Sequence, residues 1–318
     1  MSAPKSPRKG SLQYWPRKRA SKLLPSVNWN AIKVSNKLGL KGFIGYKAGM
    51  ASAIVKDNTA TSMTKGKDIT IPITIIECPP LKIFSVRFYK DRIVSKEILA
   101  ENLDKELKRK LKFPKTKNKT DINSIKPDEY DDIRVICYSD VKKTGIKKTP
   151  DLSEIGISGS LEEKMRFIKE NLHKEISIVN IFEKGQLIDL RGLTRGKGLS
   201  GPVKRFGITL KSHKSEKGQR RPGSLGPWNP SRVTFKAPMA GQIGMFTRAI
   251  YNNKIIDLGE AEDKKFDGIP NYGDLKTEYI IVAGSVQGPS KRQLIITQPL
   301  RKTKRQSKKD YKLVEVLR

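Results

Sequence analysis

The stretch GFIGYKAGMASAIV (residues 42–55) opens the part of the chain that decides the fold. Similar stretches follow it: ITIPITII (69–76), KIFSVRFY (82–89), IRVICYS (133–139), ISIVNIF (176–182), QLIDL (186–190), YIIVAGSV (279–286) and QLIIT (293–297). They are short, rich in β-branched or aromatic residues and bounded by Gly, Pro or Asp, which is typical of strands. Many short strands predict a mainly β protein that is built as a barrel.

Two other stretches have the spacing of helices. KEILAENLDKELKRKLK (96–112) places a leucine at every fourth position from Leu99 to Leu111, and SLEEKMRFIKENLH (160–173) spaces its apolar residues in the same way from Leu161 to Leu172. One apolar stripe on each stretch predicts a helix that docks on the strands. Residues 94–175 carry nearly balanced charge, so we expect an ordinary helical insertion there.

The positive charge of the chain is large and concentrated. The 318 residues include 65 Lys and Arg against 32 Asp and Glu, which gives a net charge of +33. Residues 1–41 hold ten Lys and Arg without an acid, residues 193–236 hold eleven with Glu216, and residues 290–318 hold ten with Asp310 and Glu315. Such clustering indicates a polyanion partner. We expect these segments to become ordered when that partner neutralises them.

The sequence offers little for metal, redox or membrane roles. Cys78 and Cys137 each lie within an apolar run, and no CxxC pair or Cys/His cluster occurs. We therefore expect two reduced, buried thiols and no bound metal or cofactor. The mean hydropathy of −0.54 and the lack of a long apolar run predict no membrane segment.

The glycines Gly196, Gly198 and Gly201 spell GxGxxG. A dinucleotide site would need a helix that opens at these glycines, and Pro202 with the polar run to Gly207 predicts no amphipathic helix. Their expected role is to let the backbone turn sharply and approach phosphates. The two histidines, His173 and His213, lie in helical and basic surface contexts, so no catalytic group is predicted.

Aromatic residues among the basic segments favour folded RNA over duplex DNA. They are Trp15, Trp29, Phe206, Trp228 and Phe235, and no recognition helix accompanies them. Trp228 stands between Pro227 and Asn229-Pro230, which indicates an exposed turn rather than a core position. For Trp15 and Trp29 the sequence leaves a core position and an RNA contact equally open.

Several motifs resemble one family. GYKAGM (45–50), RGKGLSGPVKRFGI (195–208), QRRPGSLGPWNPSRV (219–233) and AGQIGMFTR (240–248) resemble the third protein of the large ribosomal subunit in its archaeal and eukaryotic form. GSLQYWPRKRA (10–20) resembles the start of that family. Many relatives continue GYKAGM with Thr-His, whereas Ala51 and Ser52 follow here.

The resemblance implies a mainly β fold: a translation-factor-like six-stranded β-barrel with an inserted α-helical module and long basic rRNA-binding extensions. It implies a structural constituent of the large subunit that carries out no catalysis, acts early in assembly and sends a basic finger toward the peptidyl transferase centre. The implied partners are large-subunit rRNA and neighbouring ribosomal proteins in the cytoplasm, without a membrane or a homo-oligomer. Trp228 would be the fingertip, and Arg220 and Arg221 would clamp phosphates.

The expected segments follow the charge and strand pattern. They are a basic N-terminal extension (1–41), the first part of the barrel (42–93), the helical insertion (94–175), barrel strands (176–192), a central basic finger (193–247), the remainder of the barrel (248–289), and a last strand with a basic tail (290–318). The expected rRNA contacts are Arg17, Lys18, Arg19, Lys47, Arg195, Lys197, Lys204, Arg205, Lys211, His213, Lys214, Arg220, Arg221, Trp228, Arg232, Lys236, Arg248, Lys291, Arg292, Arg301, Lys302, Lys304 and Arg305.

Two other classes of protein also fit the basic segments. One is an RNA-modifying or RNA-remodelling enzyme that holds its substrate with basic arms, although no pocket or cofactor signature is evident. The other is a chromatin-like architectural protein, which would prefer duplex DNA to folded RNA.

Overall fold

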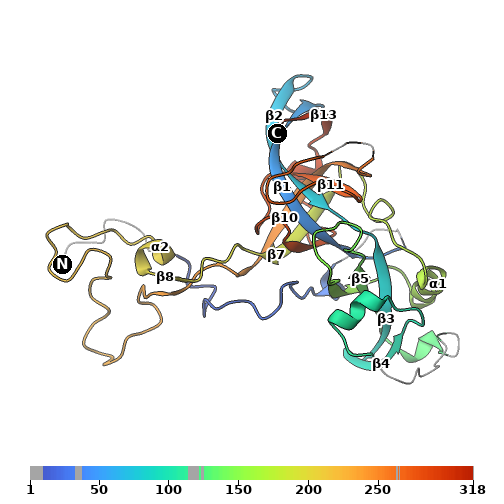
Figure 1. Ribbon diagram of the computed structural model, residues 1–318, viewed down its shortest axis with the longest axis horizontal. Helices are drawn as coiled ribbons and strands as arrows, with labels where there is room; N and C mark the ends of the chain where they lie inside the picture. Colours follow the sequence, from blue (N-terminus) through green and yellow to red (C-terminus); the bar gives the residue numbers. More distant parts are fainter. Residues whose placement is uncertain are drawn as a thin grey trace. The chain divides into compact units, whose positions relative to one another are not determined.

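The computed structural model describes residues 10–32, 38–113, 122, 125–262, 264 and 266–317. Parts of the expected N-terminal extension (1–9 and 33–37), parts of the expected helical insertion (114–121, 123 and 124) and residue 318 of the expected tail lie outside the described residues. The chain divides into two compact units, which are drawn in Figure 1. Unit 1 is Met1–Leu23 with Leu193–Arg248, and unit 2 is Leu24–Gly192 with Ala249–Arg318.

The protein is mainly β, and its larger sheet has seven strands. They are β1 (Gly42–Asp57), β2 (Asp68–Glu77), β7 (Leu187–Leu193), β10 (Thr247–Gly259), β11 (Tyr279–Ala283), β12 (Gln293–Thr297) and β13 (Tyr311–Leu317). The order in the sheet is β12-β7-β10-β11-β2-β1-β13, and β12 also pairs with β1. The long strand β1 pairs with two different strands along its length: Gly42–Tyr46 pair with β12, and Ser52–Asp57 pair with β13.

The second sheet has the order β4-β3-β5-β6. Its strands are β3 (Leu81–Lys90), β4 (Ile93–Leu99), β5 (Asp132–Ser139) and β6 (Leu152–Gly156). The 3-10 helices among the described residues include η1 (Trp29–Ala31), η2 (Lys105–Arg109) and η4 (Pro127–Glu129). The α-helices of the described residues are α1 (Leu161–Asn171), α2 (Pro202–Phe206) and α3 (Lys304–Ser307).

The predicted helix at 160–173 is confirmed as α1. The Ser160 side chain accepts from the Glu163 N–H, and the Glu163 carboxylate accepts from the Ser160 N–H. This capping box satisfies donors that the first turn of a helix leaves free. Met165 and Ile168 are buried, as the apolar spacing predicted. His173 is exposed, two residues beyond the last residue of α1.

The predicted helix at 96–112 is wrong. Its first part belongs to β4, and only Lys105–Arg109 form a short 3-10 helix. Asp91 and Arg92 have positive φ angles of 51° and 64°, which make a tight turn that folds β4 back on β3. Positive φ at both central residues suits the twist of a two-residue hairpin, so pairing with β3 overrode the leucine spacing. The segment 94–175 is therefore a mixed module with strands rather than a helical one.

The predicted strand at 176–182 is also wrong. Only Ile176 pairs, through its N–H to the Leu81 carbonyl at 2.8 Å and its carbonyl to the Leu81 N–H at 3.0 Å. The chain then turns, and the N–H groups of Ile181 and Phe182 both donate to the Ile178 carbonyl. This turn places Ile178 and Phe182 in the core together.

Six strands of the described residues had no counterpart among the expected strands. They are β4, β6, β10 and β13, and the two-residue strands at Leu199–Ser200 and Gly241–Gln242; β13 lies within the expected basic tail. Its sequence, YKLVEVL, alternates weakly, and its half-buried Leu313 and Val316 pack beside the second core cluster. The other seven expected strands overlap β1, β2, β3, β5, β7, β11 and β12.

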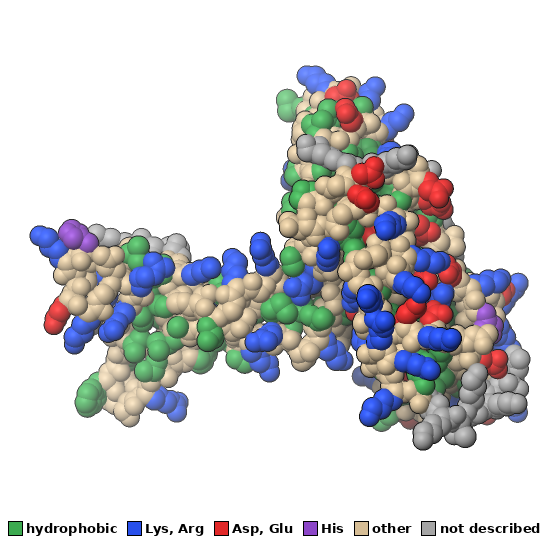
Figure 2. All heavy atoms as spheres, in the orientation of Figure 1, with side chains coloured by type: hydrophobic (Ala, Val, Ile, Leu, Met, Phe, Trp, Pro, Cys, Tyr) green, Lys and Arg blue, Asp and Glu red, His purple; other side chains and the backbone are tan. Residues whose placement is uncertain are grey.

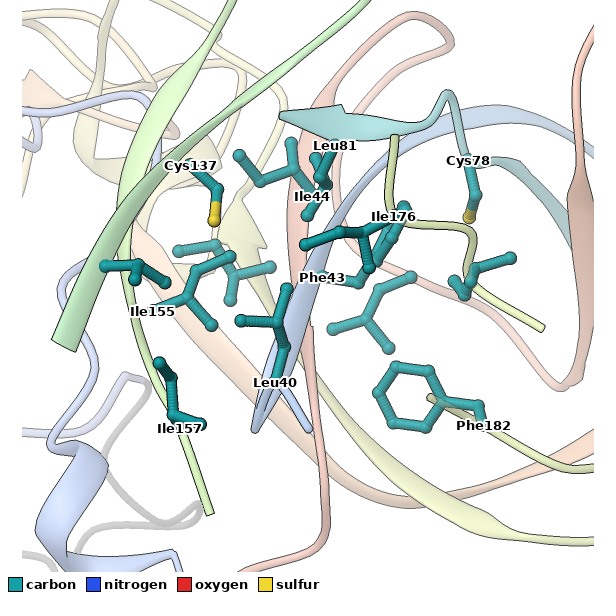
Figure 3. Packing of buried hydrophobic residues seen from close by; sticks show 14 of the residues in the cluster. Leu40, Phe43, Ile44, Cys78, Leu81, Cys137, Ile155, Ile157, Ile176 and Phe182 are labelled. Atoms are coloured by element: carbon teal, nitrogen blue, oxygen red, sulfur yellow. The ribbon is translucent and has the colours of Figure 1, made fainter. Parts of the chain in front are cut away.

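The core of unit 2 lies between strands and loops that are far apart in the sequence. Figure 3 shows residues of the first cluster, with Phe43 and Ile44 of β1 near Leu81, Ile176 and Phe182. Both cysteines belong to this cluster, are fully buried and are free thiols. Burial raises the pKa of both thiols, which keeps them protonated. The prediction of buried, reduced thiols is confirmed.

Candidate nucleic-acid interface

Unit 1 contains the glycine-rich motif, and its local structure differs from the expectation. The strands β8 (Leu199–Ser200) and β9 (Gly241–Gln242) pair with each other, and helix α2 follows β8 directly. The sequence predicted no amphipathic helix after Pro202, and the structure has a short helix of five residues there. Pro202 occupies the first turn, and Gly207 ends the helix at a φ of +68° with its N–H on the Val203 carbonyl. Proline at the start and glycine just past the end both favour a short helix.

Glycines in this unit permit close approach of two backbone segments. A Cβ on Gly244, which has a φ of +78°, would lie 2.1 Å from the Arg195 carbonyl oxygen. The Lys197 N–H donates to the Ile243 carbonyl, and the Ile243 N–H donates to the Gly198 carbonyl. The sharp turn expected of the GxGxxG glycines is present at Gly198, where φ is +64°. A side chain at Gly244 would push these two segments apart.

An aromatic cluster joins the N-terminal segment to the rest of unit 1. The ring of Trp15 stacks on Phe206 with centroids 6.1 Å apart, and meets Phe235 edge-on at 5.6 Å. The Arg17 guanidinium lies over Phe206, and the Ala20 N–H donates to the Met245 carbonyl. The two tryptophans left open by the sequence therefore differ. Trp15 packs inside unit 1, whereas Trp29 is 2% exposed in the core of unit 2.

Arg205 organises the loop that carries β9. Its Nε donates to the Gln242 carbonyl at 3.1 Å, and its Nη1 donates to the Met239 carbonyl at 3.0 Å. The guanidinium also lies over the rings of Trp15 and Phe206. Partial burial lowers the pKa of Arg205, although an arginine stays charged at neutral pH. Arg205 therefore holds protein segments together.

Lys47 has a comparable role in unit 2. It is 7% exposed, and its ammonium donates to the carbonyls of Val286 and Gly288. Burial lowers the pKa of Lys47. Arg292 is also half-buried, with a pKa that burial lowers. Their place in the expected set of rRNA contacts rested on sequence position, which does not reveal burial.

Most of the other expected contacts are exposed. The exposed members are Lys18, Arg19, Arg195, Lys197, Lys204, Lys211, His213, Lys214, Arg220, Arg221, Trp228, Arg232, Lys236, Lys291, Arg301, Lys302, Lys304 and Arg305. Arg248 is half-buried, with its guanidinium 5.1 Å from the ring centroid of Tyr14 and 5.4 Å from that of Phe246. Trp228 is 90% exposed, which confirms the expected exposed turn.

The two units differ in how their cations are compensated. Within the described part of unit 1 the single acid is Glu216, and the exposed cations of this unit have no salt bridge to a described residue. In unit 2 several cations are paired with carboxylates, as in Arg87 with Glu97 at 2.8 Å and Arg134 with Glu154 at 2.8 Å. Figure 2 shows blue side chains with little red on the part that holds α2 and β8, and both colours side by side on the other part. Unit 1 therefore carries an uncompensated positive field.

Across the described ranges, no group of three or more His, Cys, Asp or Glu side chains could hold a metal ion. None of the helices in the described part of the chain is long and apolar enough to span a bilayer.

Comparison with known proteins gives the family. The family model described as Ribosomal protein L3 matches residues 1–317. The chain belongs to the ribosomal protein L3 family. The large ribosomal subunit protein uL3 of Methanocaldococcus jannaschii is 37% identical over 309 residues, which cover 93% of this chain and 91% of that protein. The protein of the same name from Archaeoglobus fulgidus is 39% identical over 311 residues, which cover 94% of this chain and 93% of that protein.

Reasoning from the sequence missed part of the site in this member of the L3 family. It did not find that Tyr14 and Phe246 lie under the Arg248 guanidinium, or that Arg17 bonds to the Arg205 carbonyl at 3.2 Å. Tyr14 and Arg248, and Arg17 and Arg205, are far apart in the chain, and only tertiary contact brings them together. The one available signal was the density of aromatic and arginine residues in GSLQYWPRKRA (10–20).

Proposed function

We propose that this L3-family chain is a structural constituent of the large ribosomal subunit that binds large-subunit rRNA chiefly through unit 1. The relatives named above carry the large ribosomal subunit in their names. The chain acts in the cytoplasm within the ribosome, beside neighbouring ribosomal proteins, and is not an enzyme. Membership in the L3 family gives no support to an RNA-modifying or RNA-remodelling enzyme.

One observation carries the proposal. The exposed cations of unit 1 have no carboxylate partner among the described residues, whereas several cations of unit 2, such as Arg87 and Arg134, are paired. A field of uncompensated like charge is costly for a compact unit. The phosphates of RNA remove that cost and release counterions, which drives binding.

Within unit 1 we assign two kinds of role. The exposed cations and His213 contact phosphates. Arg17 and Arg205 position the backbone for those contacts through hydrogen bonds to carbonyl groups. In unit 2, Lys47 acts in the same supporting way through the Val286 carbonyl, and we leave it outside the interface.

Trp228 is the proposed tip of the basic finger formed by residues 193–247. Its ring is 90% exposed on a turn between prolines, and an exposed indole can stack on an unpaired base. By family resemblance this finger reaches toward the peptidyl transferase centre, and the protein acts early in assembly. Arg220 and Arg221 clamp phosphates along the finger.

We further infer that the larger sheet is the translation-factor-like six-stranded barrel of the family. The supporting observation is the ring of pairings from β1 through β2, β11, β10, β7 and β12 back to β1. Strand β13 then lies outside this ring, on the second half of β1. The module at 94–175 is the proposed contact with a neighbouring ribosomal protein, because its nearly balanced charge offers both signs to a protein partner and little net attraction to a polyanion.

The test compares the full chain with a chain that lacks residues 195–236, closed by a short Gly-Ser linker. Both are titrated onto deproteinised archaeal large-subunit rRNA over a range of salt, with duplex DNA as competitor. We expect the deletion to weaken binding and flatten the salt dependence, since each lost phosphate contact removes about 0.7 to 0.9 from the log–log slope. Unit 2 should keep its far-UV circular dichroism. Unchanged affinity and slope would refute the role of unit 1, and a preference for duplex DNA would favour the architectural class.

A further inference from the structure

A second group of cations gathers in unit 2, at the end of the larger sheet. We call it the hairpin–tail face and define it by its residues: Lys56, Lys65 and Lys67 of the β1–β2 hairpin, and Lys304, Arg305, Lys308, Lys309 and Lys312 of the segment from α3 into β13. Seven of these side chains are exposed and Lys309 is half-buried. Only Lys304 and Arg305 were among the rRNA contacts expected from the sequence.

Hydrogen bonds hold the two parts of this face together. The Asn58 N–H donates to the Asp310 carbonyl at 2.9 Å, and the Asp310 N–H donates to the Thr59 hydroxyl at 3.0 Å. The Lys254 ammonium also donates a hydrogen bond to the Ser307 carbonyl of the tail segment, at 3.5 Å. These bonds fix the basic segment on the sheet, so its cations are already arranged.

The arrangement places like charges directly against each other. Lys56 of β1 is the register partner of Lys312 of β13, and like charges that face each other across a ladder are destabilising. None of the eight cations forms an ion pair with a described residue.

The nearby carboxylates compensate the cations only in part. Asp57 is turned inward, where it accepts from the Thr59 N–H and the Thr64 hydroxyl. The others are Asp68, opposite Lys56, and Asp310 and Glu315 of the tail segment. Figure 2 shows the resulting mixture at the end where Figure 1 labels β2 and β13, with basic side chains around a few acidic ones. The face keeps an excess of positive charge that a partner must neutralise.

The composition of the face favours RNA over an acidic protein. The segment RKTKRQSKKD (301–310) contains no apolar side chain, and its Thr303 and Ser307 add hydroxyl groups. Protein interfaces are depleted in lysine and have an apolar centre. Contacts to the RNA backbone are instead made by Lys, Arg, Ser and Thr.

We propose that the hairpin–tail face is a second, preformed binding site for the phosphate backbone of RNA, separate from unit 1. This inference rests on the proposed function, because it assigns the same partner to another surface. The site reads no sequence, since it offers point charges and hydroxyls without a pocket for a base.

The experiment uses the full-length protein with Lys304, Arg305, Lys308 and Lys309 all changed to Gln. A matched control changes Lys90, Lys105, Lys108 and Lys174 to Gln. These four are exposed lysines of unit 2 without an ion pair among the described residues, so both variants lose the same charge. A third variant changes Lys56, Lys65 and Lys67 to Gln, which tests the hairpin without altering α3. Thermal melting checks that each variant is folded.

Binding to deproteinised archaeal large-subunit rRNA is measured between low and high salt. We expect the tail variant to lower the log–log salt slope by about 3, as four lost phosphate contacts would, and the hairpin variant by about 2. The control should keep the slope of the unmodified chain. Equal slopes for the tail, hairpin and control variants would overturn the inference.

Two further outcomes are informative. If the unmodified chain binds rRNA steeply while only deletion of residues 195–236 flattens the slope, the proposed function stands and the second site is refuted. If the tail and hairpin variants bind free rRNA normally but fail to enter subunits reconstituted from rRNA and the other ribosomal proteins, the face binds an acidic protein and the RNA assignment is wrong.

Discussion

The Arg17 guanidinium carbon lies 4.5 Å from the ring centroid of Phe206, and its Nη1 donates to the Arg205 carbonyl. The N-terminal segment and helix α2 are thereby joined, although most of unit 2 separates them in the sequence. Phe206 is 4% exposed, so this small basic unit has an apolar centre of its own. Stacked guanidinium and aromatic groups stabilise each other even where few aliphatic side chains are present.

The first prediction concerns that centre. Phe206→Ala should destabilise unit 1 locally by about 3 kcal/mol, the usual cost of removing a buried phenylalanine ring. Amide hydrogen exchange within residues 193–248 should then accelerate, while exchange within β1 and β2 stays unchanged. Phe235→Ala is the control, because that ring is 60% exposed. Equal exchange in both variants would show that Phe206 does not hold unit 1 together.

The second prediction compares two tryptophans of opposite burial. Trp228→Ala should change the free energy of unfolding by less than about 1 kcal/mol, as exposed substitutions usually do. Trp29→Ala should cost about 3 to 5 kcal/mol, because a buried ring leaves a cavity. Trp29 packs directly against Gly42 and Gly156, where an added Cβ would lie within 3 Å of it. Urea unfolding followed by circular dichroism measures both, and a large loss for Trp228→Ala would place that residue in the core.

The third prediction tests the supporting role of Lys47. Lys47→Met should lower the free energy of unfolding by about 1 to 3 kcal/mol, since buried carbonyl groups lose their donor. The salt slope of rRNA binding should remain that of the unmodified chain. The same titration with Lys197→Met, an exposed cation of unit 1, should show the reverse pattern. A reduced slope for Lys47→Met with unchanged stability would restore Lys47 to the interface.

The fourth prediction concerns acid stability. Glu154 accepts from Arg134 and Arg87 and from the Tyr89 hydroxyl. Burial alone would raise the pKa of Glu154, but these bonds outweigh it and hold the pKa below the ordinary value of 4.5. A carboxylate with a lowered folded pKa contributes stability above its unfolded pKa, and that contribution disappears as pH falls through the folded pKa.

Below about pH 5, the unmodified chain should therefore lose unfolding free energy more steeply than Glu154→Gln does. The measurement is urea unfolding at a series of pH values from 7 to 3. Glu101→Gln serves as the control, because Glu101 is exposed on the same module. The other charged groups around the site, Glu97 and Asp132, are present in all three proteins. Parallel curves for the unmodified chain and Glu154→Gln would contradict the argument.

Local signals in the sequence predicted elements whose reasons are themselves local. Helix α1 has both its apolar spacing and its capping box within residues 160–172, so it was found. The leucines at 96–112 had equally good spacing. The hairpin turn at Asp91 and Arg92 nevertheless places the first of them, Leu99, in β4, which pairs with β3. A short apolar stripe fits a helix or a strand, and only the neighbouring strand decides between them.

In the candidate site, too, some features follow from the local sequence and others only from the tertiary structure. The amino-acid order by itself determined where positive charge accumulates, that Trp228 stands on an exposed turn, and that both cysteines are buried, because these depend on composition and nearest neighbours. Tertiary structure alone decided that Lys47 is buried, that Trp15 packs on Phe206, and that Lys56 faces Lys312. Those relationships join residues far apart in the chain, and the burial and ladder pairing that create them exist only after folding.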